Sequence, residues 1–213
     1  VGVAGASGVS PDFESNYDDK DDWTQDSTGI DVNTTVAGAC ACRIGGGEER
    51  NVHQALGLTL DNNAWVARTI FNEVSAPTGN TSSFPFQICD ASGQYDAVDM
   101  IGMGEQLTNP TAYLNSNEVG GSFRQFAYGS DFSIATAYYS QLTRTTSTST
   151  KLNIFTSSDW TSELDTELTD VISSGINNLD VIYHGDNDGE NESSHRNWDI
   201  TYTAIWDGVT TPP

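Results

Sequence analysis

The last extended stretch of the chain, residues 196–208, constrains the fold more than any other feature of the sequence. Large or apolar side chains recur there at every second position, and most of the positions between them are polar. The recurring residues are Trp198, Ile200, Tyr202, Ala204 and Trp206. A period of two indicates a strand with one buried face, because successive side chains of a strand point to opposite sides. Three large aromatic rings on one face need a large apolar partner, so we predict a second sheet packed against this one.

The rest of the chain supplies strands for such a sandwich. Short apolar or alternating stretches recur along it, separated by Gly, Asn, Asp and Ser clusters. Hairpins are predicted for residues 84–89 with 97–104 and for residues 136–145 with 151–155. Residues 159–176 are compatible with a helix or an irregular segment, although their Thr, Val and Ile residues favour an extended one. No stretch has a convincing helical pattern. We therefore predict an all-β protein, a two-sheet antiparallel β-sandwich at residues 11–213 in one domain, preceded by a Gly/Ser-rich arm or linker at residues 1–10.

Charge limits the possible partners. The chain has 30 acidic and 8 basic residues, which gives a net charge of −22. Such a charge repels nucleic acid and anionic lipid, so neither is expected as a partner. No run approaches the ~20 apolar residues that a membrane span needs, so no membrane insertion is expected. The acidity has two interpretations: it keeps the surface solvated in saline or extracellular surroundings, or it also holds cations.

Three cysteines leave three alternatives. Cys89 forms a disulfide with Cys40 or Cys42, the thiols are buried and reduced, or a metal is bound. The histidines show no zinc-ligand spacing with the cysteines, which argues against the metal.

Three Asn-x-Ser/Thr sequons are typical of an exported protein, and they begin at Asn33, Asn80 and Asn191. We expect an extracellular, cell-surface or virion-surface location.

Five stretches of the sequence carry a family resemblance. They are residues 12–18 with Trp23, residues 60–68, 142–155, 176–182 and 198–207. Their pattern of strands and turns resembles the concanavalin A-like lectin/glucanase superfamily, whose fold is a jelly roll shared with laminin-G-like modules. The resemblance implies that the first and last strands are neighbours, so that residues 13–17 pair with residues 196–206. It also implies a concave face that commonly binds glycans, and a structural calcium near the joined termini.

One acidic segment resembles a catalytic motif. Glu163-Leu-Asp-Thr-Glu167 is similar to the Glu-x-Asp-x-Glu strand of laminarinase-type glycoside hydrolases. The resemblance implies that Glu163 is the nucleophile and Glu167 the general acid/base, with Asp165 separating their protonation states. Strand alternation would place the three carboxylates on one face. Thr166 departs from the family pattern, which has an apolar residue there, and the plain interpretation is a solvated acidic segment.

Calcium is the cofactor that the acidic residues suggest. The loop at residues 186–192 offers hard oxygen ligands, among them Asp186 and Asp188, around a glycine. The resemblance implies a second arrangement, in which Glu14 and Asp199 meet where the terminal strands pair. Solvated acidic loops are the plain alternative for both.

Glycan binding is expected to use aromatic side chains outside the core. Of the aromatic residues, Tyr139 and Trp160 are the least obviously buried by the sequence pattern. We therefore predict them as glycan-binding residues. Three functions are compatible with the predicted fold: a non-catalytic glycan-binding or adhesion module, a structural subunit that binds copies of itself in a surface, filament or virion assembly, and a hydrolase that uses the three carboxylates. The fold alone does not separate them.

Overall fold

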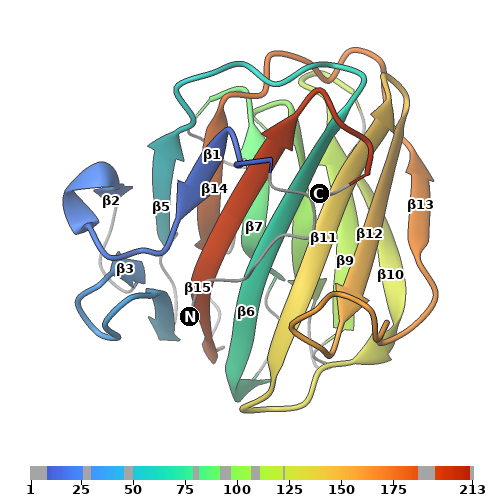
Figure 1. Cartoon of the computed structure of the whole chain (residues 1–213). Coiled ribbons are helices and arrows are strands. Elements are labelled where there is room, and N and C mark those ends of the chain that lie inside the picture. Colours follow the sequence, from blue (N-terminus) through green and yellow to red (C-terminus); the bar gives the residue numbers. More distant parts are fainter. Residues whose placement is uncertain are drawn as a thin grey trace.

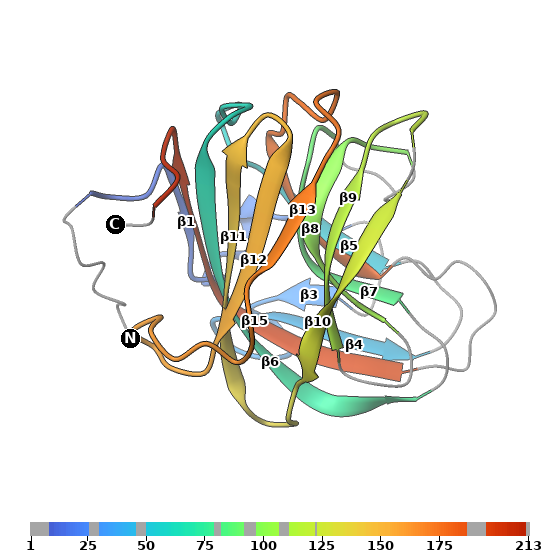
Figure 2. The ribbon, with the colours of Figure 1, turned by 90° about the vertical axis from the view of Figure 1, so that its right-hand side faces the viewer.

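The computed structural model describes residues 9–25, 30–45, 50–78, 82–91, 97–106, 111–121, 123–186 and 195–211. Within these ranges the chain is mostly β-structure, and its one helix is the short 3-10 turn η1 (Lys20–Asp22). The strands form two antiparallel sheets that pack face to face, as the side view in Figure 2 shows. The predicted all-β, two-sheet antiparallel sandwich is confirmed. No helix in the described part of the chain is long and apolar enough to cross a membrane.

Sheet A has eight strands and faces the viewer in Figure 1. In spatial order its strands are β13 (Leu168–Val171), β12 (Ser149–Phe155), β11 (Ala137–Thr146), β6 (Trp65–Thr78), β15 (His195–Asp207), β4 (Cys40–Gly45) and β3 (Ile30–Val32). The eighth strand, β1 (Phe13–Ser15), pairs with the C-terminal half of β15. The predicted hairpin of residues 136–145 and 151–155 is confirmed as β11 and β12.

Sheet B has seven strands and lies behind sheet A in Figure 1. In spatial order they are β10 (Arg124–Asp131), β9 (Thr111–Asn117), β8 (Met100–Gln106), β7 (Ser82–Cys89), β14 (Val181–Asp186), β5 (Arg50–Ala55) and β2 (Thr24–Gln25). The pairing of β7 with β8 confirms the other predicted hairpin.

The main hydrophobic core lies between the sheets. Sheet A contributes Trp65 and Phe71 from β6, and sheet B contributes Phe86 from β7 and Ile101 from β8. Each is at most 1% exposed. Burial of an apolar side chain stabilises the folded state by roughly 1.5–3 kcal/mol, so this layer is the main source of stability.

The prediction that β15 keeps one continuous apolar face is wrong. Ile200 pairs with Phe71 and Tyr202 pairs with Ile70, the next residue of β6, so Thr201 is the extra residue of a β-bulge. The bulge reverses the alternation. Trp198 and Ile200 point into the core before it, and Thr203 and Ile205 are the buried residues after it. Tyr202 and Trp206 are therefore turned away from the core, towards the outer face of sheet A.

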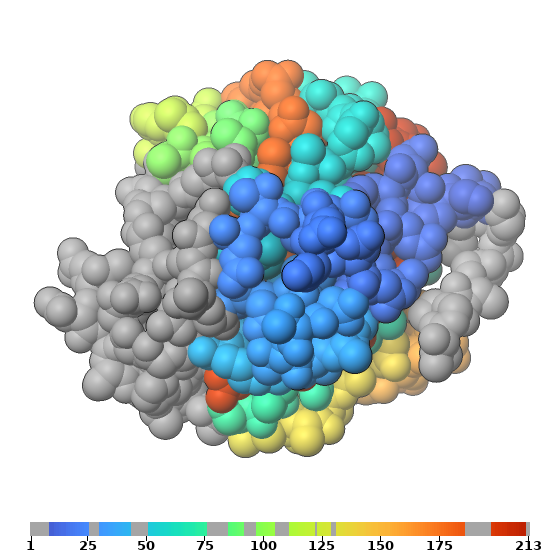
Figure 3. Space-filling model, turned by 90° about the vertical axis from the view of Figure 1, so that its left-hand side faces the viewer, coloured from blue at the N-terminus to red at the C-terminus, as the bar shows by residue number. Residues whose placement is uncertain are grey.

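The predicted pairing of the terminal strands is confirmed, because Phe13 of β1 lies opposite Ile205 of β15. Beyond β1 the chain passes over the side of the sandwich that Figure 3 shows, where the N-terminal residues, drawn in blue, cover the surface. Tyr17 anchors this segment in the core, where its ring stacks on Trp23 with 5.0 Å between the ring centroids.

The cysteines, the sequons and the N-terminal arm complete the comparison of the predictions with the fold. Cys40, Cys42 and Cys89 are all buried and form no disulfide. Of the three sequons, only Asn33 lies within the described residues, and its side-chain oxygen accepts a hydrogen bond from the backbone N–H of Gly38. Most of the predicted arm at residues 1–10 lies outside the described residues.

Candidate functional site

A row of five residues crosses the outer face of sheet B, perpendicular to its strands. Gln87 of β7 lies opposite Gly102 of β8 on one side and Tyr183 of β14 on the other. Gly102 in turn lies opposite Asn115 of β9, and Tyr183 lies opposite His53 of β5. We call these five residues the polar row. Five adjacent strands thus bring together residues that are up to 130 positions apart in the sequence.

Strand alternation explains why the polar row faces away from the main core. Phe86 and Ile88 belong to the main core, so Gln87 between them points to the opposite side. In the same way, Ile182 is a core residue and its neighbour Tyr183 is not. Tyr183 belongs instead to a separate apolar cluster with Cys89, Val98 and Met100.

The two amides of the polar row are buried without complete hydrogen bonding. Gln87 is 1% exposed and Asn115 is fully buried. Nε2 of Gln87 and both Oδ1 and Nδ2 of Asn115 have no hydrogen-bond partner within the described part of the chain. A buried polar group without a partner costs about 1–3 kcal/mol, and such groups are rare in native proteins. These atoms are unused hydrogen-bonding capacity, and a ligand reaches them only where the side chains that cover them move apart.

The Gln87 amide has one defined contact, through its oxygen. The Cys89 thiol donates to Oε1 of Gln87 over 3.7 Å. Burial raises the pKa of the Cys89 thiol well above its ordinary value, with a smaller contribution from Asp90, so this thiol keeps its proton. With its oxygen engaged in this way, the amide has the Nε2 hydrogens left for another acceptor.

Two glycines give the larger side chains of this face their space. A Cβ on Gly102 would lie 2.6 Å from the carbonyl oxygen of Phe86 and 2.8 Å from Cγ of Gln87. A Cβ on Gly185 would lie 2.3 Å from the Tyr183 ring. Gln87 therefore packs closely beside Gly102, and Tyr183 lies over Gly185. Cγ of Gln87 lies where a side chain at position 102 would begin, so the glycine leaves room for Gln87 itself.

The predicted glycan-binding residues lie on the other face of the molecule. Tyr139 of β11 and Trp160 are brought together on the outer face of sheet A, with ring centroids 5.5 Å apart. The Arg68 guanidinium stacks on Trp160 at 4.6 Å from the ring centroid, and Nε of Arg68 donates to Gln141 over 3.0 Å. Trp160 is only 8% exposed. Its ring supports Tyr139 and is not itself open to a sugar.

The three carboxylates of the predicted catalytic motif do not form a strand. They lie in the connection between β12 and β13, where Glu163 makes one isolated bridge to Phe155. Glu163 accepts a hydrogen bond from Asn153 over 3.0 Å, and Glu167 pairs with Lys151 at 2.8 Å. The expectation of three carboxylates on one strand face is therefore wrong, because the segment is irregular. A catalytic role for these residues stays a prediction.

Of the two predicted metal sites, one is contradicted by the structure and the other lies largely outside the described residues. Glu14 pairs with Ala204, five residues beyond Asp199 on β15, which corresponds to roughly 16 Å of strand. Glu14 and Asp199 therefore do not meet, and Asp199 instead binds Arg43 at 2.6 Å. Asp186 ends β14, but its side chain and all of Asp188 lie outside the described residues. In the described ranges, no three His, Cys, Asp or Glu side chains form a group that could hold a metal.

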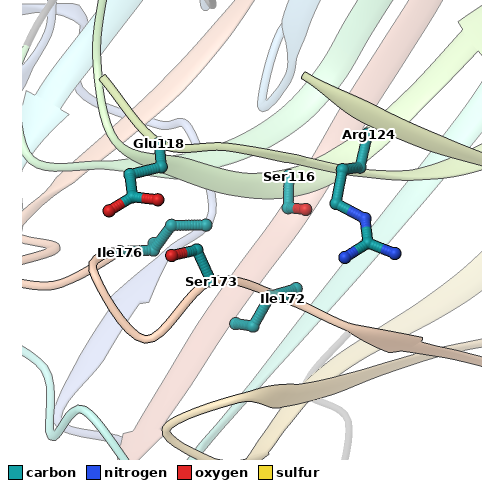
Figure 4. Close-up of a pocket in the computed structure, with 6 residues that line it drawn as sticks. All are labelled: Ser116, Glu118, Arg124, Ile172, Ser173 and Ile176. Atoms are coloured by element: carbon teal, nitrogen blue, oxygen red, sulfur yellow. The ribbon is translucent and has the colours of Figure 1, made fainter. Parts of the chain in front are cut away.

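A cavity of about 210 Å³ opens at the edge of the sandwich, where β10 lies near β13 (Figure 4). Among the described residues that line it, the one cation is Arg124, which pairs with Asp170 at 3.3 Å and also donates to the carbonyl of Val171. Burial raises the pKa of Asp170, while the charge of Arg124 opposes that rise. Since the guanidinium is already engaged, this cavity has less unused hydrogen-bonding capacity than the polar row.

Sequence reasoning did not find the polar row. Gln87 and Asn115 each stand as one polar residue among alternating strand residues, which is also the pattern of a solvated face. The signal that distinguishes them is the register across β7, β8 and β9, and register is not visible in a single sequence.

No protein-family model matches this sequence, and no curated protein matches it. Similar solved structures share its fold at low identity. Xyloglucan PUL GH43B of Bacteroides ovatus has a TM-score of 0.59 and 9% identity, over 91% of this chain and 39% of that one. The binding domain of botulinum neurotoxin serotype D has a TM-score of 0.60 and 9% identity, over 95% of this chain and 48% of that one. Botulinum neurotoxin type C has a TM-score of 0.54 and 13% identity, over 87% of this chain and 43% of that one. The chain thus spans about two fifths of the Bacteroides protein and less than half of each toxin chain.

Proposed function

We propose that this protein is a non-catalytic carbohydrate-binding module that binds glycan along the polar row of sheet B. The observation that carries the proposal is a set of three buried amide atoms, which belong to Gln87 and Asn115 on either side of Gly102 and have no partner among the described residues. A carbohydrate presents hydroxyl groups that both donate and accept hydrogen bonds, so it can pair with amide N–H and C=O groups alike.

The composition of the row favours an uncharged, hydroxyl-rich ligand. Its members provide two amides, a phenol and an imidazole, with no carboxylate, lysine or arginine among them. The Tyr183 ring is an apolar neighbour of the amides, but it is 5% exposed and packs with Cys89, Val98 and Met100, so the hydrogen-bonding groups and not a stacking ring carry the proposal.

The similar structures support the same ligand class. The Bacteroides ovatus protein carries xyloglucan in its name, and cell entry of the type C toxin is described as dependent on interaction with two ganglioside molecules. The resemblance to concanavalin A-like lectins, which commonly bind glycans on one sheet face, points the same way. As part of this proposal we place the protein outside the cell, where such ligands occur.

The absence of catalysis is part of the proposal and has its own test. Glu163 and Glu167 are engaged by Asn153 and Lys151, and both lie at sheet A rather than at the polar row. We expect no cleavage of β-glucan by the wild-type protein. Cleavage that disappears in the Glu163→Gln variant would show instead that the protein is a hydrolase.

A glycan array probed with wild type, Gln87→Ala and Asn115→Ala tests the binding proposal. We expect wild type to bind a set of neutral glycans, and each variant to lose at least about tenfold in affinity, because a charge-neutral hydrogen-bond group that faces the ligand is removed. Asn153→Ala is the matched control, since Asn153 is also a nearly buried amide but is paired with Glu163 on the other sheet. An array without binding by wild type, or equal losses in the control, would contradict the proposal.

A further inference from the structure

We propose a second binding site on the outer face of sheet A, on the opposite side of the sandwich from the polar row, and we assign to it a sugar that carries a free amine. The site is a cavity of about 720 Å³ between β1, β11 and β15. The lining residues used in the argument are Glu14, Asp18, Ile70, Tyr139, Thr201 and Tyr202. This proposal does not depend on glycan binding at the polar row.

The β-bulge of β15 creates one wall of this cavity. Since Thr201 is the extra residue, Tyr202 is turned to the outer face, where it lies opposite Ile70 of β6. Ile70 also lies opposite Tyr139 of β11. Two tyrosines thus flank one isoleucine across three adjacent strands, with the outer strands about 9.5 Å apart. This arrangement forms an apolar floor between two rings, at a width that accommodates a pyranose.

Tyr139 is held in place from behind. Trp160 contacts it edge to face, and Phe155 supports Trp160 from the other side, at 6.0 Å between ring centroids. Arg68 lies over the Trp160 ring and near the Trp206 ring, at 4.6 and 5.9 Å from their centroids. Such cation–π contacts fix the aromatic groups relative to each other, so the ring that faces the cavity is preorganised.

The charges that face the cavity are negative. Glu14 and Asp18 line it, and the described lining residues include no lysine, arginine or histidine. Burial together with the nearby Glu14 charge raises the pKa of Tyr202 to about 12. The phenol therefore stays protonated at neutral pH, beside the Glu14 carboxylate.

The charge of Arg68 acts on Tyr202, but Arg68 is not among the described residues that line the cavity. Arg68 is engaged by Gln141 and by the two tryptophan rings, and burial lowers its pKa to about 10. It therefore stays protonated at neutral pH, but its guanidinium is directed at protein groups. The net charge of −22 adds a long-range repulsion of anionic ligands.

These features together select the ligand. The two tyrosines and Ile70 suit the apolar face of a sugar ring, and the carboxylates suit an ammonium group on it. A sugar with a carboxylate or sulfate is repelled, whereas one with an N-acetylated amine loses the ionic contact. An exposed ion pair contributes about 0.2–1 kcal/mol, so a free amine should strengthen binding by about 1.4- to 5-fold at low salt.

The test uses three probes at low salt: tetramers of glucosamine, of N-acetylglucosamine and of a uronic acid. Binding of each is measured by titration with wild type, Tyr139→Ala and Glu14→Gln, and chemical shifts report which face responds. We expect the glucosamine tetramer to bind best and to shift signals around Tyr139. We also expect Tyr139→Ala to abolish binding, and Glu14→Gln to remove the preference for the free amine while leaving weaker binding.

Two controls separate the outcomes. Glu118→Gln removes a carboxylate at the far edge of the sandwich and should change nothing. Gln87→Ala should leave the glucosamine response intact, which distinguishes a failure of the polar row from a failure of this second site. Equal binding of the three tetramers, a preference for the uronic acid, or no shift around Tyr139 with any of them would overturn the inference.

Discussion

The phenol oxygen of Tyr17 lies 2.8 Å from Nε2 of His184, which connects the segment after β1 to the middle of sheet B. The same oxygen lies 2.7 Å from the Thr203 hydroxyl on β15, so the contact also includes sheet A. Nδ1 of His184 lies 2.6 Å from the Pro85 carbonyl and must carry a hydrogen, because a carbonyl only accepts. In the neutral ring Nε2 then accepts from Tyr17, and Thr203 donates to Tyr17.

Tyr17→Phe should destabilise the fold. The variant keeps the ring that stacks on Trp23 but leaves Nε2 of His184 buried without a donor. The expected loss is about 1–3 kcal/mol in the free energy of unfolding, measured by urea denaturation. Tyr139→Phe serves as the control, because that hydroxyl is not part of the buried network; an equal loss in both variants would contradict this account.

Stability should fall as the pH is lowered from about 6.5 to about 4. Burial lowers the pKa of His184 to about 4, whereas an unfolded histidine titrates near 6.5. The unfolded state therefore binds more protons than the folded state in this window. This lowers the free energy of unfolding by about 3 kcal/mol at the acidic end. Above pH 6.5 the contribution of His184 to stability is complete.

The comparison with His184→Gln isolates this effect from the titration of carboxylates. The free energy of unfolding is measured for both proteins between pH 7 and pH 4. The difference between them should shrink as the pH falls, and a constant difference would show that His184 does not titrate as described.

Gly102→Ala should impair both stability and binding at the polar row. The added Cβ would meet the Phe86 carbonyl at 2.6 Å, which is backbone and cannot move alone, and it would displace Gln87. We expect a loss of about 1–3 kcal/mol in unfolding free energy and weaker glycan binding by the folded fraction. Unchanged binding in a folded Gly102→Ala protein would show that the space beside Gln87 is not part of the site.

Trp160→Ala should loosen the outer face of sheet A. Arg68, Tyr139 and Phe155 all lose a ring contact, and the truncation of a nearly buried tryptophan costs about 3–5 kcal/mol. Thermal unfolding measures the loss, and Trp160→Phe should restore most of it. Binding at the polar row should persist below the new melting temperature, since that row lies on the opposite sheet.

The sequence predicts the architecture well for physical reasons that are local. The alternation of β11 and β12, and the Thr/Ser-rich turn between them, are enough to predict that hairpin. The pairing of Phe13 with β15 was accessible through the family resemblance. The bulge at Thr201 was not, because one extra residue leaves the polar and apolar pattern around it intact while it reverses which face each side chain occupies.

The site was less predictable than the fold. Tyr139 and Trp160 do lie together, but whether a ring faces solvent or another ring depends on the connection between β12 and β13, whose path is irregular. Gln87 and Asn115 become neighbours only through the registers of β7, β8 and β9. Register depends on which residues of neighbouring strands pair, and these pairs cannot be inferred from a single sequence.

The most direct test of the central claim measures stability and glycan binding together in the Gln87→Leu variant. Leucine has a similar volume and no polar atoms, so it removes the buried amide hydrogens that lack a partner. If these atoms are kept for a ligand, the variant should be more stable than wild type, by about 1 kcal/mol or more, and should lose glycan binding. A Gln87→Leu protein that is less stable than wild type and still binds glycan would contradict the claim.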